Sequence, residues 1–74
     1  MKAIKKEQVV KAYESVQELM KGNGPIMMLS PKEMYEIGKF AQYVELLVLN
    51  VGSELVVLPE DIDWVVGETQ GWII

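Results

Sequence analysis

The sequence contains no cysteine, no histidine and no arginine. Without cysteine it can form no disulfide, and without cysteine and histidine it lacks the usual ligands of a structural zinc site. Its few serines have no histidine that would activate a hydroxyl group as a nucleophile. We therefore expect a protein that is not an enzyme and that holds no metal or other cofactor.

The chain is also short, with 74 residues, which predicts one small domain over residues 1–74. A domain of this size buries only about 60% of the surface that its unfolded chain exposes. Small folds often add a disulfide, a metal or a partner subunit, and the composition removes the first two. Half of the residues are apolar, at 50%, so we expect apolar surface that remains outside the core and contacts a partner.

Positive charge is scarce in the second half. All seven lysines lie at or before Lys39, whereas the segment from Glu45 onward has six acidic residues and no lysine. The net charge of −4 disfavours direct nucleic-acid binding, which requires cations that displace counterions from phosphates. The absence of arginine disfavours it further, because the guanidinium group is the preferred contact for phosphate and guanine.

Long apolar runs are absent as well. A run such as Leu46–Leu49 is four residues long, far short of the ~20 residues that cross a bilayer. Lys2, Lys5 and Lys6 resemble the charged start of a signal peptide, but Glu7 interrupts the apolar stretch that should follow. We expect a cytoplasmic protein that does not bind membranes.

Two helices are predicted in the first two thirds of the chain. Residues 4–21 form an amphipathic pattern that Gly22 and Pro25 end. Its apolar residues recur at helical spacing: Val9, Ala12, Tyr13, Val16, Leu19 and Met20.

The second helix has the clearest start in the sequence. Ser30, Pro31 and Glu33 match a capping box, with serine at the N-cap, proline at the first helical position and glutamate at the third. This predicts a helix over residues 31–50. Its last part is rich in leucine and valine, so the alternative is that residues 43–50 form a strand paired with residues 54–58.

The remaining residues predict a small antiparallel β-meander. The three strands are expected at about 54–58, 63–66 and 71–74. Residues 67–70 would form the loop of the last hairpin, which pairs Trp64 with Ile73. The predicted fold class is therefore α+β, with two N-terminal helices followed by the meander.

Surface residues of the C-terminal half are the candidates for binding. Tryptophan is enriched at binding hot spots, and an apolar terminal strand has to be covered. The carboxylates near residue 61 do not match a calcium-binding loop, because valines stand where a further ligand and the glycine belong. The candidate interface residues are Leu46, Leu49, Glu60, Asp61, Asp63, Trp64, Trp72, Ile73 and Ile74.

Two hypotheses for function follow. The first is a non-enzymatic protein–protein interaction module whose partner is itself, as a homodimer or small oligomer. The second helix would pack across a two-fold axis, or terminal strands would pair edge to edge. The alternative is an acidic inhibitor or decoy of the phage type, which binds a basic site on another protein, including a nucleic-acid-binding one.

Overall fold

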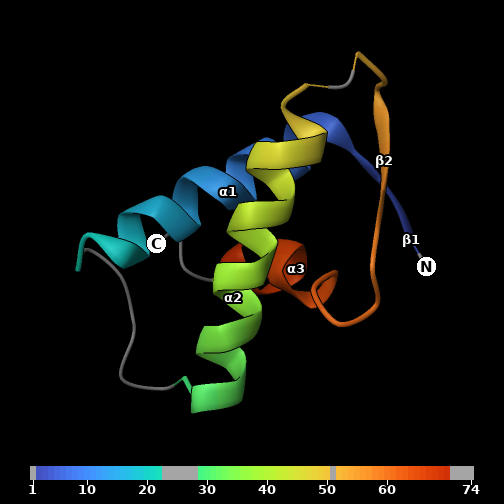
Figure 1. Ribbon diagram of the computed structural model, residues 1–74. Coiled ribbons are helices and arrows are strands. Elements are labelled where there is room, and N and C mark those ends of the chain that lie inside the picture. The colour runs from blue at the N-terminus through green and yellow to red at the C-terminus, as the bar shows by residue number, and fades with distance from the viewer. Residues whose placement is uncertain (1, 23–28, 51, 71–74) are drawn as a thin grey trace.

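The computed structural model describes residues 2–22, 29–50 and 52–70 (Figure 1). In chain order its elements are strand β1 (Lys2–Lys5), helix α1 (Lys6–Met20), helix α2 (Pro31–Tyr43), the π-helix η1 (Val44–Val48), strand β2 (Leu55–Leu58) and helix α3 (Trp64–Gln70). The mixed α+β class is confirmed. The predicted order is not, because a strand precedes the helices.

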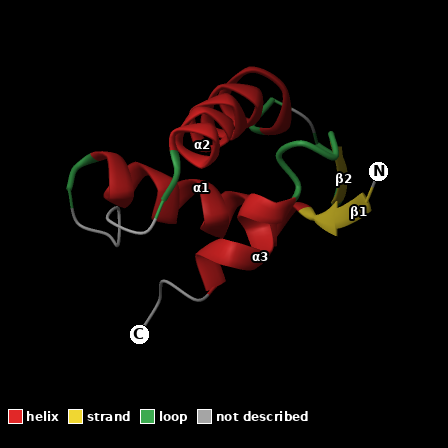
Figure 2. Ribbon diagram, turned by 90° about the horizontal axis from the view of Figure 1, so that it is seen from below, coloured by secondary structure: helices red, strands yellow, loops and turns green. Residues whose placement is uncertain are grey.

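Helix α1 lies in the middle of the molecule. Helix α2 and η1 cross it on one side and α3 packs on the other, while the two strands lie together at one end (Figures 1 and 2). The apolar stripe of α1 therefore faces two neighbours. The largest core side chains come from the helices, β2 and the turn before α3, and they are fully buried: Val9, Val16, Ile37, Phe40, Val44, Val48, Leu58, Ile62 and Val65.

The capping box that predicted the start of the second helix is present. The Ser30 side chain accepts a hydrogen bond of 3.2 Å from the main-chain N–H of Glu33. Glu33 Oε1 in turn accepts one of 2.9 Å from the N–H of Ser30. These bonds satisfy two main-chain donors that the first helical turn leaves without a partner. Proline occupies the first helical position, as predicted.

The helix continues past Tyr43 in π geometry and does not become a strand. The N–H of Leu49 donates to the carbonyl of Val44, five residues earlier, at 3.0 Å. Val44 and Val48 are both buried within this segment. The alternative of a strand over residues 43–50 is therefore wrong. The helix that begins at the capping box continues through this segment, and its valines are buried in helical conformation.

The first strand was not predicted. β1 pairs antiparallel with β2, and the register places Ile4 opposite Val56. Ile4, Val56 and Leu58 face the core, whereas Leu55 and Val57 are exposed on the outer face of the sheet. The first helix consequently begins at Lys6 and not at residue 4.

The predicted strand over residues 63–66 is wrong, as is the hairpin loop over residues 67–70. The N–H groups of Ile62 and Asp63 both donate to the carbonyl of Pro59, at 3.1 and 3.0 Å. This turn leads directly into α3, which continues to Gln70. The buried residues Ile62, Val65, Val66 and Thr69 recur at helical spacing. The predicted third strand, 71–74, lies outside the described residues.

Candidate interaction surface

The structure separates the predicted interface residues into three groups. Leu46 and Leu49 are exposed near the end of the second helix, by 65% and 45%. Trp64 and the three carboxylates lie at the turn before α3 and at its start. Trp72, Ile73 and Ile74 lie outside the described residues.

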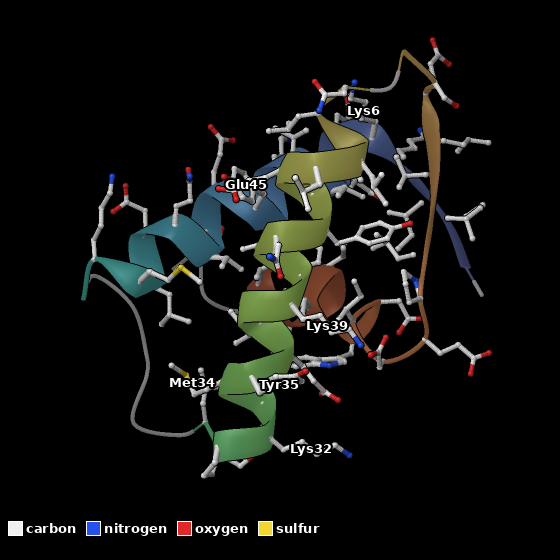
Figure 3. The ribbon with its side chains drawn as sticks, viewed as in Figure 1. Lys6, Lys32, Met34, Tyr35, Lys39 and Glu45 are labelled. Atoms are coloured by element: carbon white, nitrogen blue, oxygen red, sulfur yellow. The ribbon has the colours of Figure 1, made fainter. Side chains whose placement is uncertain are left out.

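Leu46 continues one face of α2. Tyr35, Gly38, Gln42 and Leu46 follow one another at intervals of three and four residues, so they share one side of the helix. We call these four residues the outer face. Tyr35 and Leu46 at its two ends are 71% and 65% exposed. Figure 3 shows α2 crossing in front of α1, with Tyr35 labelled near its lower end.

The outer face contains no charged residue, although 24% of the chain is charged. Lys39 lies beside it and is occupied by an ion pair with Asp61. Glu45 lies beside it as well and accepts a hydrogen bond from Tyr13. Lys39 and Glu45 are thus held by partners on other elements, whereas Lys32, three residues before Tyr35, is an exposed charge beside the outer face. The outer face itself is a neutral strip with a large side chain, Tyr35 or Leu46, at each end.

Gly38 lies in the middle of this strip. A glycine in a helix interior destabilises it by roughly 0.5–1 kcal/mol relative to alanine. A Cβ built at this position would have no other heavy atom within 4 Å. Contacts among the described residues therefore do not require a glycine here. The space above it is open.

The π-helix η1 and the residue after it carry three exposed leucines. Val44 and Val48 enter the core, whereas Leu46, Leu47 and Leu49 are all exposed. The segment ends at Asn50, whose Nδ2 donates to the carbonyls of Glu45 and Leu46 at 3.4 and 3.3 Å. Asn50 thus satisfies carbonyl groups that the end of a helix leaves free. π-Helical turns are frequent at functional sites.

A hydrogen bond of Glu45, which is labelled in Figure 3, joins η1 to α1. The Tyr13 hydroxyl donates a hydrogen bond of 2.5 Å to Glu45 Oε1 and accepts one of 2.9 Å from Gln17 Nε2. The hydrogen bond to the Glu45 carboxylate raises the pKa of Tyr13, and desolvation and the negative charge raise it further. The neighbouring Leu46 is therefore presented by a segment that is held in place.

Trp64 ties α3 to α2 and is only partly exposed. Its indole N–H donates to Glu36 Oε1 and to the carbonyl of Asp61, both at 3.0 Å. Its ring packs against the hydrophobic core. As a candidate interface residue, Trp64 thus offers only part of its ring to a partner, because its polar atom and much of its surface are already used.

The acidic turn is partly neutralised within the chain. Asp61 forms an ion pair with Lys39, which lowers the pKa of Asp61 and raises the pKa of Lys39, mainly through the hydrogen bond between them. Asp63 lies at the rim of a groove beside β1. Among residues 2–22, 29–50 and 52–70, no three acidic side chains are grouped so that they could hold a metal ion.

A second exposed apolar area lies on the sheet. Leu55 is 57% exposed, and it borders a groove of about 880 Å³ between the start of α1 and residues 52–55. The charged residues that line this groove are of both signs: Lys5, Lys6, Glu7, Lys11, Glu14 and Glu54. Three are lysines and three are glutamates, so their formal charges balance.

Comparison with protein-family models, with curated proteins and with solved structures gave no match for this chain. Within the part of the chain that the structure describes, no helix has both the length and the apolar character needed to cross a membrane.

Proposed function

We propose that this protein is a non-enzymatic protein–protein interaction module that forms a homodimer through the outer face of α2. The observation that carries the proposal is the position of Gly38 between Tyr35 and Leu46 on an uncharged, exposed helix face. Gly38 makes the helix less stable, and no contact within the described part of the chain compensates for this. Contacts with a second chain that packs over the glycine would do so.

The spacing of the outer face supports a two-fold arrangement. Gly38 and Leu46 each lie four residues from Gln42. If two copies of α2 cross in antiparallel fashion at Gln42, Leu46 of each copy meets Gly38 of the other. A two-fold interface is self-complementary in this way, because residue i contacts residue j and residue j contacts residue i. The leucine side chain fills the volume that the glycine leaves open.

The chemistry of the outer face favours a second copy over a charged partner. A neutral strip gains nothing from an oppositely charged surface, whereas burial of Tyr35 and Leu46 removes apolar area from water. Gln42 would meet its own symmetry mate, and the amide group has both the donor and the acceptor that such a pair needs. The acidic-decoy hypothesis has less support, because Lys39 already neutralises Asp61.

Sedimentation velocity tests the proposal over micromolar to millimolar concentrations. We expect the unmodified chain to sediment as a dimer and the Leu46→Glu variant as a monomer, because the interface would have to bury the introduced charge. Leu55→Glu is the matched control, since Leu55 is similarly exposed but lies on the sheet; it should leave the dimer intact. A monomeric unmodified chain, or a dimer that only Leu55→Glu dissociates, contradicts the proposal.

A further inference from the structure

The two outer edges of the β1–β2 sheet differ. On β2 three outward-facing main-chain groups are occupied by side chains: the N–H and carbonyl of Leu55 and the carbonyl of Val57. The Tyr43 hydroxyl donates to the carbonyl of Val57 at 3.1 Å. Ser53 Oγ accepts from the N–H of Leu55 at 3.3 Å and donates to its carbonyl at 2.9 Å. Such coverage blunts an edge that would otherwise recruit another strand.

The outer edge of β1 is not covered in this way. The N–H of Lys6 donates to the carbonyl of Glu54 at 2.7 Å. Hydrogen-bonded pairs alternate along an antiparallel ladder, so Ile4 bonds to β2 while Ala3 and Lys5 direct their N–H groups away from it. Ala3 also directs its carbonyl outward. Among the described residues no strand pairs with this edge.

A groove runs along the same edge. It has a volume of about 450 Å³ and is lined by Ala3, Ile4 and Lys5 of β1 and by Val66 and Gly67 of α3. Gln8 of α1, Leu55 of β2 and Asp63 before α3 complete the lining. Figure 2 shows α3 beside β1. This volume lies within the range of roughly 300–1,000 Å³ that is common for binding pockets. A strand added to β1 would lie in this groove.

We propose that the edge of β1 and this groove bind an extended segment of a partner protein in which acidic and apolar residues alternate. The segment would form main-chain hydrogen bonds with Ala3 and with the N–H of Lys5, as in other cases of strand addition. Successive residues of a strand point to opposite faces. Residues on the side of Lys5 would be acidic, and those between them would pack over Val66 and Gly67.

Charge decides between this partner and a second copy of the chain. The sequence of β1 is Lys-Ala-Ile-Lys, and two such strands side by side would bring lysines together, which is destabilising. Helix α1 begins directly after β1, and its N-cap residue Lys5 supplies no side-chain cap. The positive end of that helix favours an acidic neighbour. Asp63 also lines the groove, and its negative charge would repel acidic residues of the segment. Those residues are therefore expected on the side of Lys5.

The test uses the full chain and a synthetic acetylated peptide, Asp-Val-Asp-Val-Asp, followed by amide NMR. We expect the peptide to shift the resonances of Ala3, Lys5, Val66 and Gly67 and to slow hydrogen exchange at Ala3. Ala3→Pro removes one outward N–H without breaking a bond to β2, and should weaken binding about tenfold or more. Ala3→Val keeps the N–H and is the matched control, which should bind as the unmodified chain does.

A second variant keeps the test decisive if Ala3→Pro does not fold. Lys5→Glu should lose the acidic peptide and bind Lys-Val-Lys-Val-Lys instead. The proposal is overturned if the acidic peptide shifts no resonance of β1, if the unmodified chain binds both peptides equally, or if Ala3→Pro retains full affinity. A homodimer that Ala3→Pro dissociates would assign this edge to a second copy and would also overturn it. Dimerisation through α2 is independent of all these outcomes.

Discussion

The Tyr13 hydroxyl on α1 donates a 2.5 Å hydrogen bond to the Glu45 carboxylate on η1, thirty-two residues further along the chain. This bond joins the central helix to the segment that carries the exposed leucines. The α2–η1 helix and α1 also contribute buried residues to one core cluster, Phe40 and Val16 among them. The surface proposed for dimerisation is thus held by both apolar packing and a specific polar contact.

Tyr13→Phe should reduce stability, and its effect should depend on alkaline pH. The pKa of Tyr13 is raised above its usual value of 10.0 by the hydrogen bond to Glu45. A group whose pKa is raised on folding contributes stability that is fully present below the unfolded pKa and is lost as the pH rises through the folded pKa. Urea unfolding at pH 7 and above pH 10 measures this. The difference between the two proteins should shrink at high pH; a constant difference would contradict it.

Gly38→Ala should have opposite effects on the stability of the monomer and on the affinity of the proposed dimer. In the monomer the added methyl group meets no atom, so the helix gains about 0.5–1 kcal/mol of stability from the better propensity of alanine. In the proposed dimer the same methyl group occupies space that Leu46 of the partner needs. Thermal unfolding of dilute protein should therefore show a higher melting temperature, while sedimentation shows a weaker dimer. Equal strengthening of both would contradict the proposed interface.

Ser30→Ala should cost about 1 kcal/mol of stability, because it removes the N-cap acceptor of α2. The stability that the capping box supplies should also depend on pH in the acidic range, because Glu33 takes part in it. Hydrogen bonds from the N–H and the side chain of Ser30 lower the pKa of Glu33 from its usual 4.5. That stability is present above pH about 4.5 and is lost as the pH falls through the lowered pKa. Denaturant titrations of Ser30→Ala and Glu33→Gln below and above this pH should show it, with Pro31 left unchanged in both.

Tyr43→Phe should expose the edge of β2 without disturbing the core. The Tyr43 hydroxyl occupies the carbonyl of Val57 at 3.1 Å, and the loss of one such bond costs about 0.5–1.5 kcal/mol. Hydrogen exchange should quicken along β2 and remain unchanged in α1. Tyr35→Phe is a matched control, because its ring is exposed on the outer face and is distant in sequence from the sheet. Similar effects of both variants on β2 would contradict this role of Tyr43.

The sequence predicted those elements whose signals are local. The capping box at Ser30 depends on residues within one helical turn, and the structure has it in full. The spacing of the apolar residues in α1 likewise predicted the buried face of this helix, except for Met20, which is exposed. β1 was not predicted because its partner strand lies about fifty residues away in the sequence. In addition, a single buried residue, Ile4, cannot show the alternation of apolar and polar residues that identifies a strand.

The error over α3 has a specific cause. Trp64, Val65 and Val66 favour strands by propensity, and this outweighed the helical spacing of Ile62, Val65, Val66 and Thr69. That spacing was visible in the sequence, and the structure follows it. Thr69 is buried without loss because its hydroxyl donates to the carbonyl of Val66 at 3.1 Å. Packing against α1 decides the conformation here, and tertiary contacts routinely override propensity.

The candidate site was predictable only in part. The sequence led to the prediction that Leu46 and Leu49 belong to an interface, and both are exposed. It did not single out Gly38, because the space around a helical glycine is known only from the structure. The ion pair of Lys39 with Asp61 was equally hidden, since the two residues lie on different elements. Both features depend on how α2 lies relative to the rest of the chain.

Disulfide formation by a Gln42→Cys variant tests the proposed dimer most directly, because the chain has no native cysteine. In the antiparallel arrangement each introduced thiol lies at the two-fold axis and faces its own copy. Mild oxidation should convert this variant almost completely to a covalent dimer, whereas Glu14→Cys on the exposed side of α1 should remain largely monomeric. Equal yields from the two variants, or a Gln42→Cys protein that stays monomeric, would contradict dimerisation through the outer face.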